Sequence, residues 1–291
     1  MKRIDFEHGT VTGNILGAAL PMLVAQILNL LYNIVDRVYI ARIPEVGTAA
    51  LGAVGLCFPL IVIISAFANL FGTGGAPLFS IFRGKKEETK AVCVMNTSFS
   101  LVCVCAILLM MIGLVFAHPL LVLFGASDTS MIYAYPYMMI YLIGTLPSMI
   151  AIGMNPFINA QGYSLIGMLS VAIGALTNLL LDPVFIFLLG LGVRGAAIAT
   201  VLSQCLSAVF VMFFLMKKAE LKVRFLHKMC IRDRNQDRWI LQKYSCNRNT
   251  LFLTAGQSGS SLTNKCLILI RKFHDKFMNI SLLCRLNNLF H

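Results

Sequence analysis

Two aspartates stand inside long apolar stretches of the sequence, where a carboxylate is costly. Asp182 lies in "ALTNLLLDPVFIFLLG", and Asp36 lies in "LLYNIVDRVYIAR". On insertion scales an aspartate at the centre of a membrane helix costs about 2.5–3.5 kcal/mol, so a functional role is the default hypothesis for such a residue. We therefore predict that both carboxyl groups take part in binding or exchanging an ion.

An amide and a hydroxyl are predicted to lie beside these carboxylates. Asn178 precedes Asp182 by four residues, which places both on one face of a helix. Counted from the neighbouring loops at about 1.5 Å per residue, Asp36, Asp182 and Thr200 lie at a similar depth, roughly 9–12 Å below the same end of their helices. Such a layer can exchange protons near neutral pH, or it can hold Na⁺ through its oxygen atoms.

Two prolines interrupt the hydrogen bonding of the same stretches. Pro183 has no N–H to donate to the carbonyl of Leu179, and Pro21 removes a hydrogen bond from the first span in the same way. We predict that both residues bend their helices. Beside Asp182, a bend that depends on protonation would couple an ion to movement, although proline in membrane helices is also common as a purely structural residue.

Two alternative interpretations of the aspartates remain open. Asp36 could form an ion pair with Arg37, although adjacent side chains on a helix point about 100° apart. The two aspartates could instead be the dyad of an intramembrane aspartyl protease. The GxGD pattern of those enzymes is absent, because three leucines precede Asp182.

The composition predicts the environment of these residues. Hydrophobic residues make up 58% of the 291 residues and charged residues 12%, and the mean hydropathy is +0.81. A soluble domain typically carries about twice that share of charge. No charged residue occurs between Glu45 and Arg83 or between Asp128 and Asp182, and uncharged apolar runs of about 18 residues or more are candidate membrane spans. The chain is predicted to be an all-α polytopic membrane protein.

Six transmembrane helices can be placed on the sequence. We expect the second to end at Gly72-Thr-Gly-Gly75, and Asn155-Pro156 and Gln161-Gly162 to separate the fourth from the fifth, because such residues mark turns. The nine cysteines contain no CxxC pair, so we predict neither a metal site nor a disulfide framework. The predicted spans are 13–40, 48–72, 92–116, 131–153, 164–188 and 194–216.

The lysines and arginines predict the orientation of these helices. If the N-terminus is cytoplasmic, the cytoplasmic side of residues 1–228 carries eleven basic residues and the outer side carries three, namely Arg37, Arg42 and Arg194. No cleavable signal peptide is evident, because the first apolar run is too long. We predict a multi-pass protein of the bacterial inner (plasma) membrane with a cytoplasmic N-terminus. Its basic charge reports orientation and does not indicate nucleic-acid binding.

The character of the sequence changes after Lys228, which divides it into segments 1–228 and 229–291. The second segment holds ten basic and three acidic residues and no uncharged run long enough to span a membrane. Its first residues, Met229-Cys-Ile-Arg-Asp-Arg234, resemble a translation of the transposase-end adaptor of sequencing libraries. We predict an aberrant tail of adaptor and out-of-frame readthrough, and the alternative is a genuine basic cytoplasmic tail.

Several separated motifs resemble one transporter family. "LPMLVAQILNLLYNIVDRVYIAR", "GTGGAPLFSIFRGKKEET", "NPFINAQG" and "ALTNLLLDPVFIFLLGLGVRGAAIAT" occur in this order. They are similar to multidrug and toxic compound extrusion (MATE) transporters, closest to the prokaryotic DinF-like and MepA-like branch, over roughly residues 10–225. The resemblance implies one lobe, the N-lobe, of a twelve-helix antiporter that exports amphipathic cationic compounds in exchange for H⁺ or Na⁺, with no other cofactor. It also implies that the N-lobe pocket falls on Pro21, Asp36, Asn178, Asp182 and Thr200.

The predicted chain departs from that family in its number of helices. Six spans are present where the family has twelve, so the C-lobe is expected to be missing. Because alternating access needs two lobes around a shared site, the chain alone is predicted to be inactive unless two copies assemble. A lipid-precursor flippase of the same superfamily is the nearest alternative function. It would be expected to line its cavity with more arginine than the single Arg37 found here.

Overall fold

A computed structural model of the chain describes residues 11–44 and 46–223, and the predicted segment 229–291 lies outside these residues. The described part is built almost wholly of helices joined by short turns. Seven are α-helices, and π-helical turns follow two of them. In chain order they are α1 (Val11–Ala41), α2 (Gly47–Gly84), α3 (Glu88–Leu123), α4 (Asp128–Ile143), α5 (Thr145–Ala160), α6 (Ser164–Pro183), η1 (Val184–Leu188), α7 (Gly192–Phe213) and η2 (Phe214–Lys218).

The predicted membrane spans are confirmed, one of them in a broken form. Five helical segments within residues 11–223 are long and apolar enough to cross a membrane: α1, α2, α3, α6 with η1, and α7 with η2. Helices α4 and α5 meet at an angle of 57° and pass the same test only as a pair, and together they take the place of the predicted fourth span. The all-helical membrane fold predicted from composition is therefore correct.

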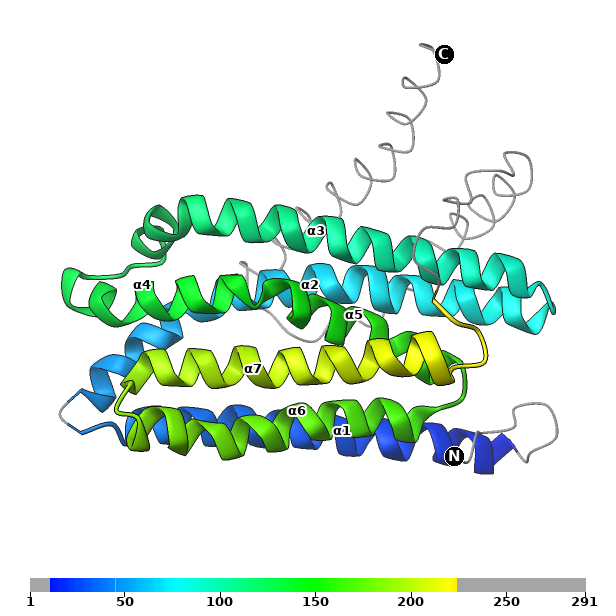
Figure 1. Cartoon of the computed structure of the whole chain (residues 1–291), viewed down its shortest axis with the longest axis horizontal. Helices are drawn as coiled ribbons and strands as arrows, with labels where there is room; N and C mark the ends of the chain where they lie inside the picture. Colours follow the sequence, from blue (N-terminus) through cyan, green and yellow to red (C-terminus); the bar gives the residue numbers. More distant parts are fainter. Residues whose placement is uncertain (1–10, 45, 224–291) are drawn as a thin grey trace, which may run out of the picture. The chain divides into compact units, whose positions relative to one another are not determined.

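The helices run back and forth between two ends of the bundle, as Figure 1 shows. The start of α1, the α2–α3 turn, the α5–α6 turn and the end of α7 lie at one end. The α1–α2, α3–α4 and α6–α7 turns lie at the other. We call these the first and second ends of the bundle. In this arrangement α6 packs between α1 and α7, which brings the three predicted site helices together.

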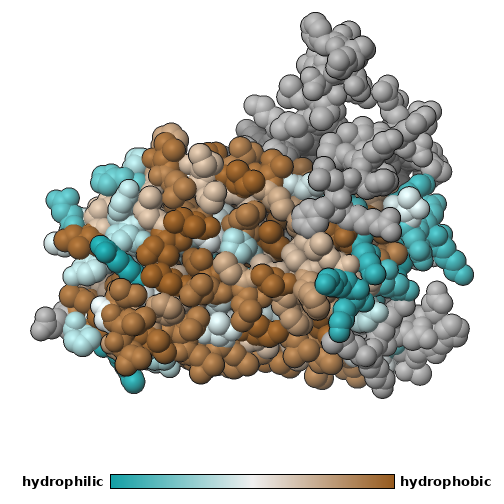
Figure 2. Space-filling model, viewed as in Figure 1, coloured by the Kyte–Doolittle hydropathy of each residue, from teal (hydrophilic) through white to brown (hydrophobic). Residues whose placement is uncertain are grey.

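The surface of the bundle matches a lipid environment. Figure 2 shows a hydrophobic belt between two hydrophilic ends. Large apolar side chains point outward from this belt, among them Val115, Leu180 and Leu188, which are 69%, 69% and 80% exposed. A soluble protein rarely exposes such a continuous apolar surface. In a bilayer these side chains contact lipid tails instead of water.

The expected end of the second span at Gly72–Gly75 is wrong, because α2 continues without interruption to Gly84. These glycines serve close packing rather than a turn. A Cβ on Gly72 would lie 2.5 Å from the carbonyl oxygen of Gly153 in α5, and one on Gly75 would lie 2.8 Å from the ring of Phe157. A membrane span must satisfy its own backbone hydrogen bonds, so glycines within it do not by themselves end the helix.

The expected break at Asn155-Pro156 is wrong, because both residues lie inside α5. The expected break at Gln161-Gly162 is correct, because these residues form the turn between α5 and α6. A further bend falls at Gly144, between α4 and α5. A Cβ at Gly144 would lie 2.5 Å from the side chain of Val201 in α7, so the absence of a side chain lets the bend approach that helix. The side-chain amide of Asn155 donates to the carbonyl of Gly167 at 2.9 Å, which ties α5 to α6 instead of ending a span.

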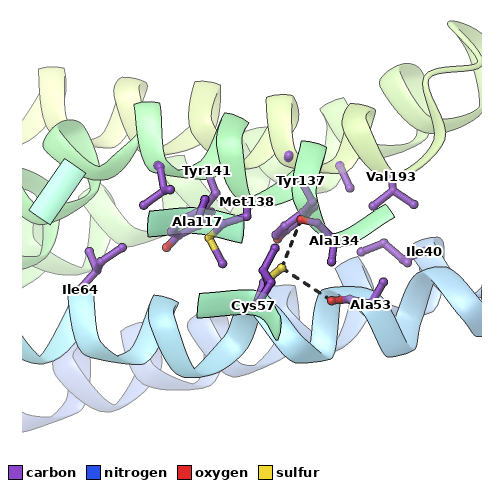
Figure 3. Packing of buried hydrophobic residues seen from close by; sticks show 14 of the residues in the cluster. Ile40, Ala53, Cys57, Ile64, Ala117, Ala134, Tyr137, Met138, Tyr141 and Val193 are labelled. Atoms are coloured by element: carbon purple, nitrogen blue, oxygen red, sulfur yellow. Dashed lines mark hydrogen bonds between the residues drawn. The ribbon is translucent and has the colours of Figure 1, made fainter. Parts of the chain in front are cut away.

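The core lies between α2, α4 and the neighbouring helices (Figure 3). The thiol of Cys57 in α2 contacts the carbonyl oxygens of Ala53 and Ala134 at 3.6 Å each. Tyr137 and Tyr141, one turn apart on α4, stack with ring centroids 6.4 Å apart. Small residues in α2 allow α2 and α4 to approach each other closely, and the buried tyrosines of α4 lie in the core beside them. The core is therefore apolar but carries hydroxyl groups near the predicted site.

Candidate functional site

Asn178 joins two polar side chains in the middle of the predicted site. Its side-chain nitrogen donates to Asp182 Oδ1 at 3.2 Å and lies 3.4 Å from Thr200 Oγ1. The hydroxyl of Thr200 donates in turn to the carbonyl of Ala196 at 2.9 Å. Asn178 and Asp182 are 1% and 0% exposed, and Thr200 is 9% exposed. The structure thus brings three of the predicted residues into one buried network between α6 and α7.

Asp36 reaches the same network from α1. Helix α1 packs against α6, and the carboxyl group of Asp36 lies near that of Asp182. Asp36 Oδ1 and Asp182 Oδ2 are buried, and neither atom has a hydrogen-bond donor within the described part of the chain. Two buried carboxylates that face each other repel unless a proton or a cation lies between them. The two aspartates therefore form a pair suited to holding one positive charge.

The helix that carries Asp182 changes its hydrogen-bond pattern directly after this residue. Pro183 is the last residue of α6, and the π-helical turn η1 follows at once. The amide of Leu189 donates to the carbonyl of Val184 at 2.9 Å, which is a spacing of five residues in place of four. Because Pro183 has no N–H, the carbonyl of Leu179 loses its helical donor. Such π-helical turns are frequent at functional sites.

Pro21 lies far from the other predicted site residues. It is fifteen residues before Asp36 on the same helix, which corresponds to about 22 Å. Helix α1 is continuous from Val11 to Ala41 with Pro21 inside it. The structure therefore groups Asp36, Asn178, Asp182 and Thr200, whereas Pro21 belongs to the other half of α1.

The structure does not favour a simple ion pair between Asp36 and Arg37. The guanidinium group of Arg37 lies over the ring of Phe58, 5.1 Å from its centroid. Arg37 still acts on Asp36 through its charge, and Asp36 also interacts with Asp182 on α6.

Tyrosines near the aspartates were missed by the sequence analysis. Tyr32 and Tyr137 are both close enough to Asp36 to interact with it electrostatically. Tyr137 is 3% exposed, and it is stacked on Tyr141 in the core. A spacing signal was present, because Tyr32 precedes Asp36 by four residues and Tyr137 precedes Tyr141 by four. Their hydroxyl groups add polar surface to the side of the pair that faces α4.

The sequence relatives of the chain are multidrug exporters. Multidrug export protein MepA of Staphylococcus haemolyticus is 27% identical over 215 residues, which cover 74% of this chain and 47% of that protein. MepA of Staphylococcus aureus is 24% identical over the same length. The chain therefore spans about half the length of the curated relatives that it matches.

Solved structures share the arrangement of helices. An outward-facing multidrug resistance MATE family transporter of the MOP superfamily is 27% identical, with a TM-score of 0.72. The match covers 83% of this chain and 52% of that chain. A MATE protein in a bent conformation is 26% identical, with a TM-score of 0.70 and coverage of 76% and 50%. The fold seen here is thus that of one half of these transporters.

The family profile described as MatE matches residues 21–184, which is more than half of the chain and includes both aspartates of the buried pair. The sequence relatives, the solved structures and the family profile all indicate the same family. The chain belongs to the MATE family of membrane transporters.

Proposed function

We propose that helices α1–α7 are the ion-coupling half of a multidrug exporter that exchanges amphipathic cationic compounds for a cation. The observation that carries this proposal is the pair of Asp36, which is half-buried, and Asp182, which is fully buried and joined through Asn178 to Thr200. A buried carboxylate pair is costly in a membrane, and its cost is offset when it binds a cation. Membership of a transporter family excludes the intramembrane protease considered for the same two aspartates.

The orientation of Asn178 supports H⁺ as the coupling ion. Its nitrogen, rather than its oxygen, faces Asp182 and Thr200. Asn178 could become a ligand of Na⁺ only through its oxygen, so its amide would have to turn over from the orientation in which it donates to Asp182 Oδ1. A proton shared between Asp36 and Asp182 needs no such change. We therefore propose that the pair takes up one proton as the compound is released to the outside, and that it gives up this proton to the cytoplasm before the next compound binds.

Infrared difference spectroscopy of the purified chain tests proton binding. As the pH is lowered, the carbonyl stretching band of a protonated carboxyl group should appear, and it should be lost in both Asp36→Asn and Asp182→Asn. Asp128 at the second end of the bundle provides a matched control, and Asp128→Asn should keep the band. If 100 mM Na⁺ in place of K⁺ removes the band in the wild-type chain, Na⁺ competes for the pair. A wild-type band that persists in both variants overturns the proposal.

We propose further that binding is linked to movement through Pro183 and η1. Protonation removes the repulsion between the two aspartates and lets α1 and α6 approach. The helix next to Asp182 can respond, because its hydrogen bonds already change register at that point. Relatives of known structure include MATE proteins named as bent and straight conformations, which is the kind of change that such a helix permits.

A second half is proposed to be necessary for export. Alternating access requires two bundles that move around a shared site, and the relatives are about twice as long as the matched region. Cells expressing this chain alone should accumulate a cationic dye such as ethidium as strongly as cells expressing Asp182→Asn. Dye efflux above that control would contradict the proposal. Co-expression with the C-terminal half of a MATE relative should restore efflux if the halves assemble.

The distribution of charge supports a cytoplasmic first end in a bacterial plasma membrane. The first end carries Arg83, Lys85, Lys86, Lys90, Lys217 and Lys218, whereas the second end carries Arg42 and Arg194. Basic residues are retained on the cytoplasmic side of a membrane. Cysteine replacements at Lys86 and Leu189 provide the test. A membrane-impermeant maleimide added to intact cells should label the cysteine at 189 and leave the one at 86 unlabelled, and the reverse pattern would overturn this orientation.

A further inference from the structure

The residues that directly follow α7 and η2 remain packed against the bundle. Beyond η2, buried and exposed side chains alternate over residues 219–223. Ala219, Leu221 and Val223 are 3%, 7% and 3% exposed, whereas Glu220 and Lys222 are exposed. Every second side chain of this segment is therefore buried. We call residues 219–223 the strap, and its first residues are the yellow segment after α7 in Figure 1.

A buried glutamine holds the centre of the strap. The side-chain nitrogen of Gln161 donates to the carbonyl of Leu221 at 3.2 Å, and the amide of Leu221 donates to Gln161 Oε1 at 3.2 Å. The two bonds form the reciprocal pair that a neighbouring strand would make. Gln161 is 0% exposed and caps the end of α5. A buried amide without partners costs about 1–3 kcal/mol, so this position is built to receive the strap.

An ion pair holds the strap on its outer side. Arg83, at the end of α2, places Nη2 2.6 Å from Glu220 Oε2. The same guanidinium group donates through Nη1 to the carbonyl of Ala160, 3.3 Å away, next to Gln161. The amide of Val223 donates back to Leu215 in η2 at 3.1 Å. Helix α2, the end of α5 and the turn η2 thus each make a polar contact with the strap.

We propose that the strap is a latch, in which Gln161 and Arg83 anchor the polypeptide that follows α7 to the ends of α2 and α5. A movement of that polypeptide is then transmitted to the α5–α6 turn, where Gln161 lies. Without the latch, the polypeptide would be attached to the bundle only through the end of α7. Helix α6 begins three residues after Gln161 and carries Asn178 and Asp182. The latch stands on contacts separate from the aspartate pair, and it holds whether or not that pair binds a proton.

Spin-label mobility in the full chain tests the latch. A label at a cysteine replacing the exposed Lys222 should be immobile in the wild type. In Gln161→Leu the ratio of mobile to immobile label should rise at least about tenfold, since loss of about 1.4 kcal/mol changes an equilibrium constant by a factor of ten. A second label at Leu188, at the opposite end of the bundle, reports whether the fold is intact and should not change. Gln26→Leu is the matched control, because Gln26 is an exposed glutamine on α1.

The ion pair gives an independent measurement that does not depend on Gln161→Leu folding. Arg83→Gln and Glu220→Gln should each increase the mobility of the label at 222. The effects of the two changes should not add in the double variant, because either change alone removes the ion pair. A label at 222 that is already mobile in the wild type would overturn the latch. Mobility that stays unchanged in Gln161→Leu and in both ion-pair variants would overturn it as well.

Discussion

The side-chain nitrogen of Asn178 lies 3.2 Å from Asp182 Oδ1 and 3.4 Å from Thr200 Oγ1. One amide therefore links a carboxylate on its own helix to a hydroxyl on the next helix. The remaining oxygen of Asp182 is left for Asp36, which approaches from α1. Because Asn178 orients one side of the carboxylate, it decides which oxygen faces the other aspartate. Asn178 and Thr200 should therefore affect ion binding through the position of the Asp182 carboxylate.

Replacing Asn178 with leucine should weaken both stability and ion binding. The change leaves Asp182 Oδ1 buried without its donor, which costs about 1–3 kcal/mol. Thermal unfolding in detergent should show a lower midpoint, and the infrared carboxyl band should change its dependence on pH. Asn69→Leu is the control, since Asn69 is exposed and donates only to the carbonyl of Ser65 within its own helix. Equal effects of the two changes would contradict a special role for Asn178.

Thr200 offers a test of the hydroxyl alone. Thr200→Val keeps the shape of the side chain but removes the acceptor that Asn178 uses, whereas Thr200→Ser keeps it. We expect the valine variant to lose about 0.5–1.5 kcal/mol of stability, the net value of one hydrogen bond, and to release the amide of Asn178. The serine variant should retain the wild-type pH dependence of the carboxyl band. The idea fails if serine and valine behave alike in that titration.

Pro183→Ala should make the end of α6 more regular. An alanine can donate to the carbonyl of Leu179, so the cause of the change in hydrogen-bond register is removed. Spin labels can replace the exposed Leu165 and Leu188 in a background without native cysteines. Double electron–electron resonance then measures the distance between the two labels, which is about 34 Å along a straight helix. The distance should shift with pH in the wild type and stay constant in Pro183→Ala. A shift of the same size in both proteins would refute a hinge at this position.

The close approach of α2 and α5 predicts different effects for two nearby glycines. A Cβ at Gly72 would lie 2.5 Å from the carbonyl oxygen of Gly153, whereas nothing lies within 4 Å of a Cβ at Gly74. Gly72→Ala should destabilise the bundle by about 1–3 kcal/mol through overpacking. Gly74→Ala should be neutral or stabilising by up to about 1 kcal/mol, because alanine favours a helix. Thermal unfolding of both variants measures the contrast, and similar midpoints would mean that the contact carries no strain.

The errors of the sequence analysis lie at helix ends and have a common physical cause. Gly72–Gly75 and Asn155-Pro156 are turn-forming residues in water, yet both lie inside helices here. In a membrane a broken helix leaves backbone groups unsatisfied, so continuity prevails where neighbours permit it. A bend that was not predicted occurs at Gly144, within the fourth span, and its close contact with Val201 on α7 is not encoded near it in the sequence. Tertiary contacts therefore decided which glycines ended helices.

Local chemistry in the sequence was sufficient to determine the membrane fold and to point to individual residues. Apolar runs of span length predicted the helices, and the cost of burying a carboxylate drew attention to Asp36 and Asp182. The four-residue spacing placed Asn178 beside Asp182, since both lie on one helix. The meeting of Asp36 with Asp182, the choice of the nitrogen of Asn178 as donor, and the capture of residues 219–223 by Gln161 were decided only by tertiary structure. Each joins residues from different helices, and the distance between two helices depends on the packing of the whole bundle.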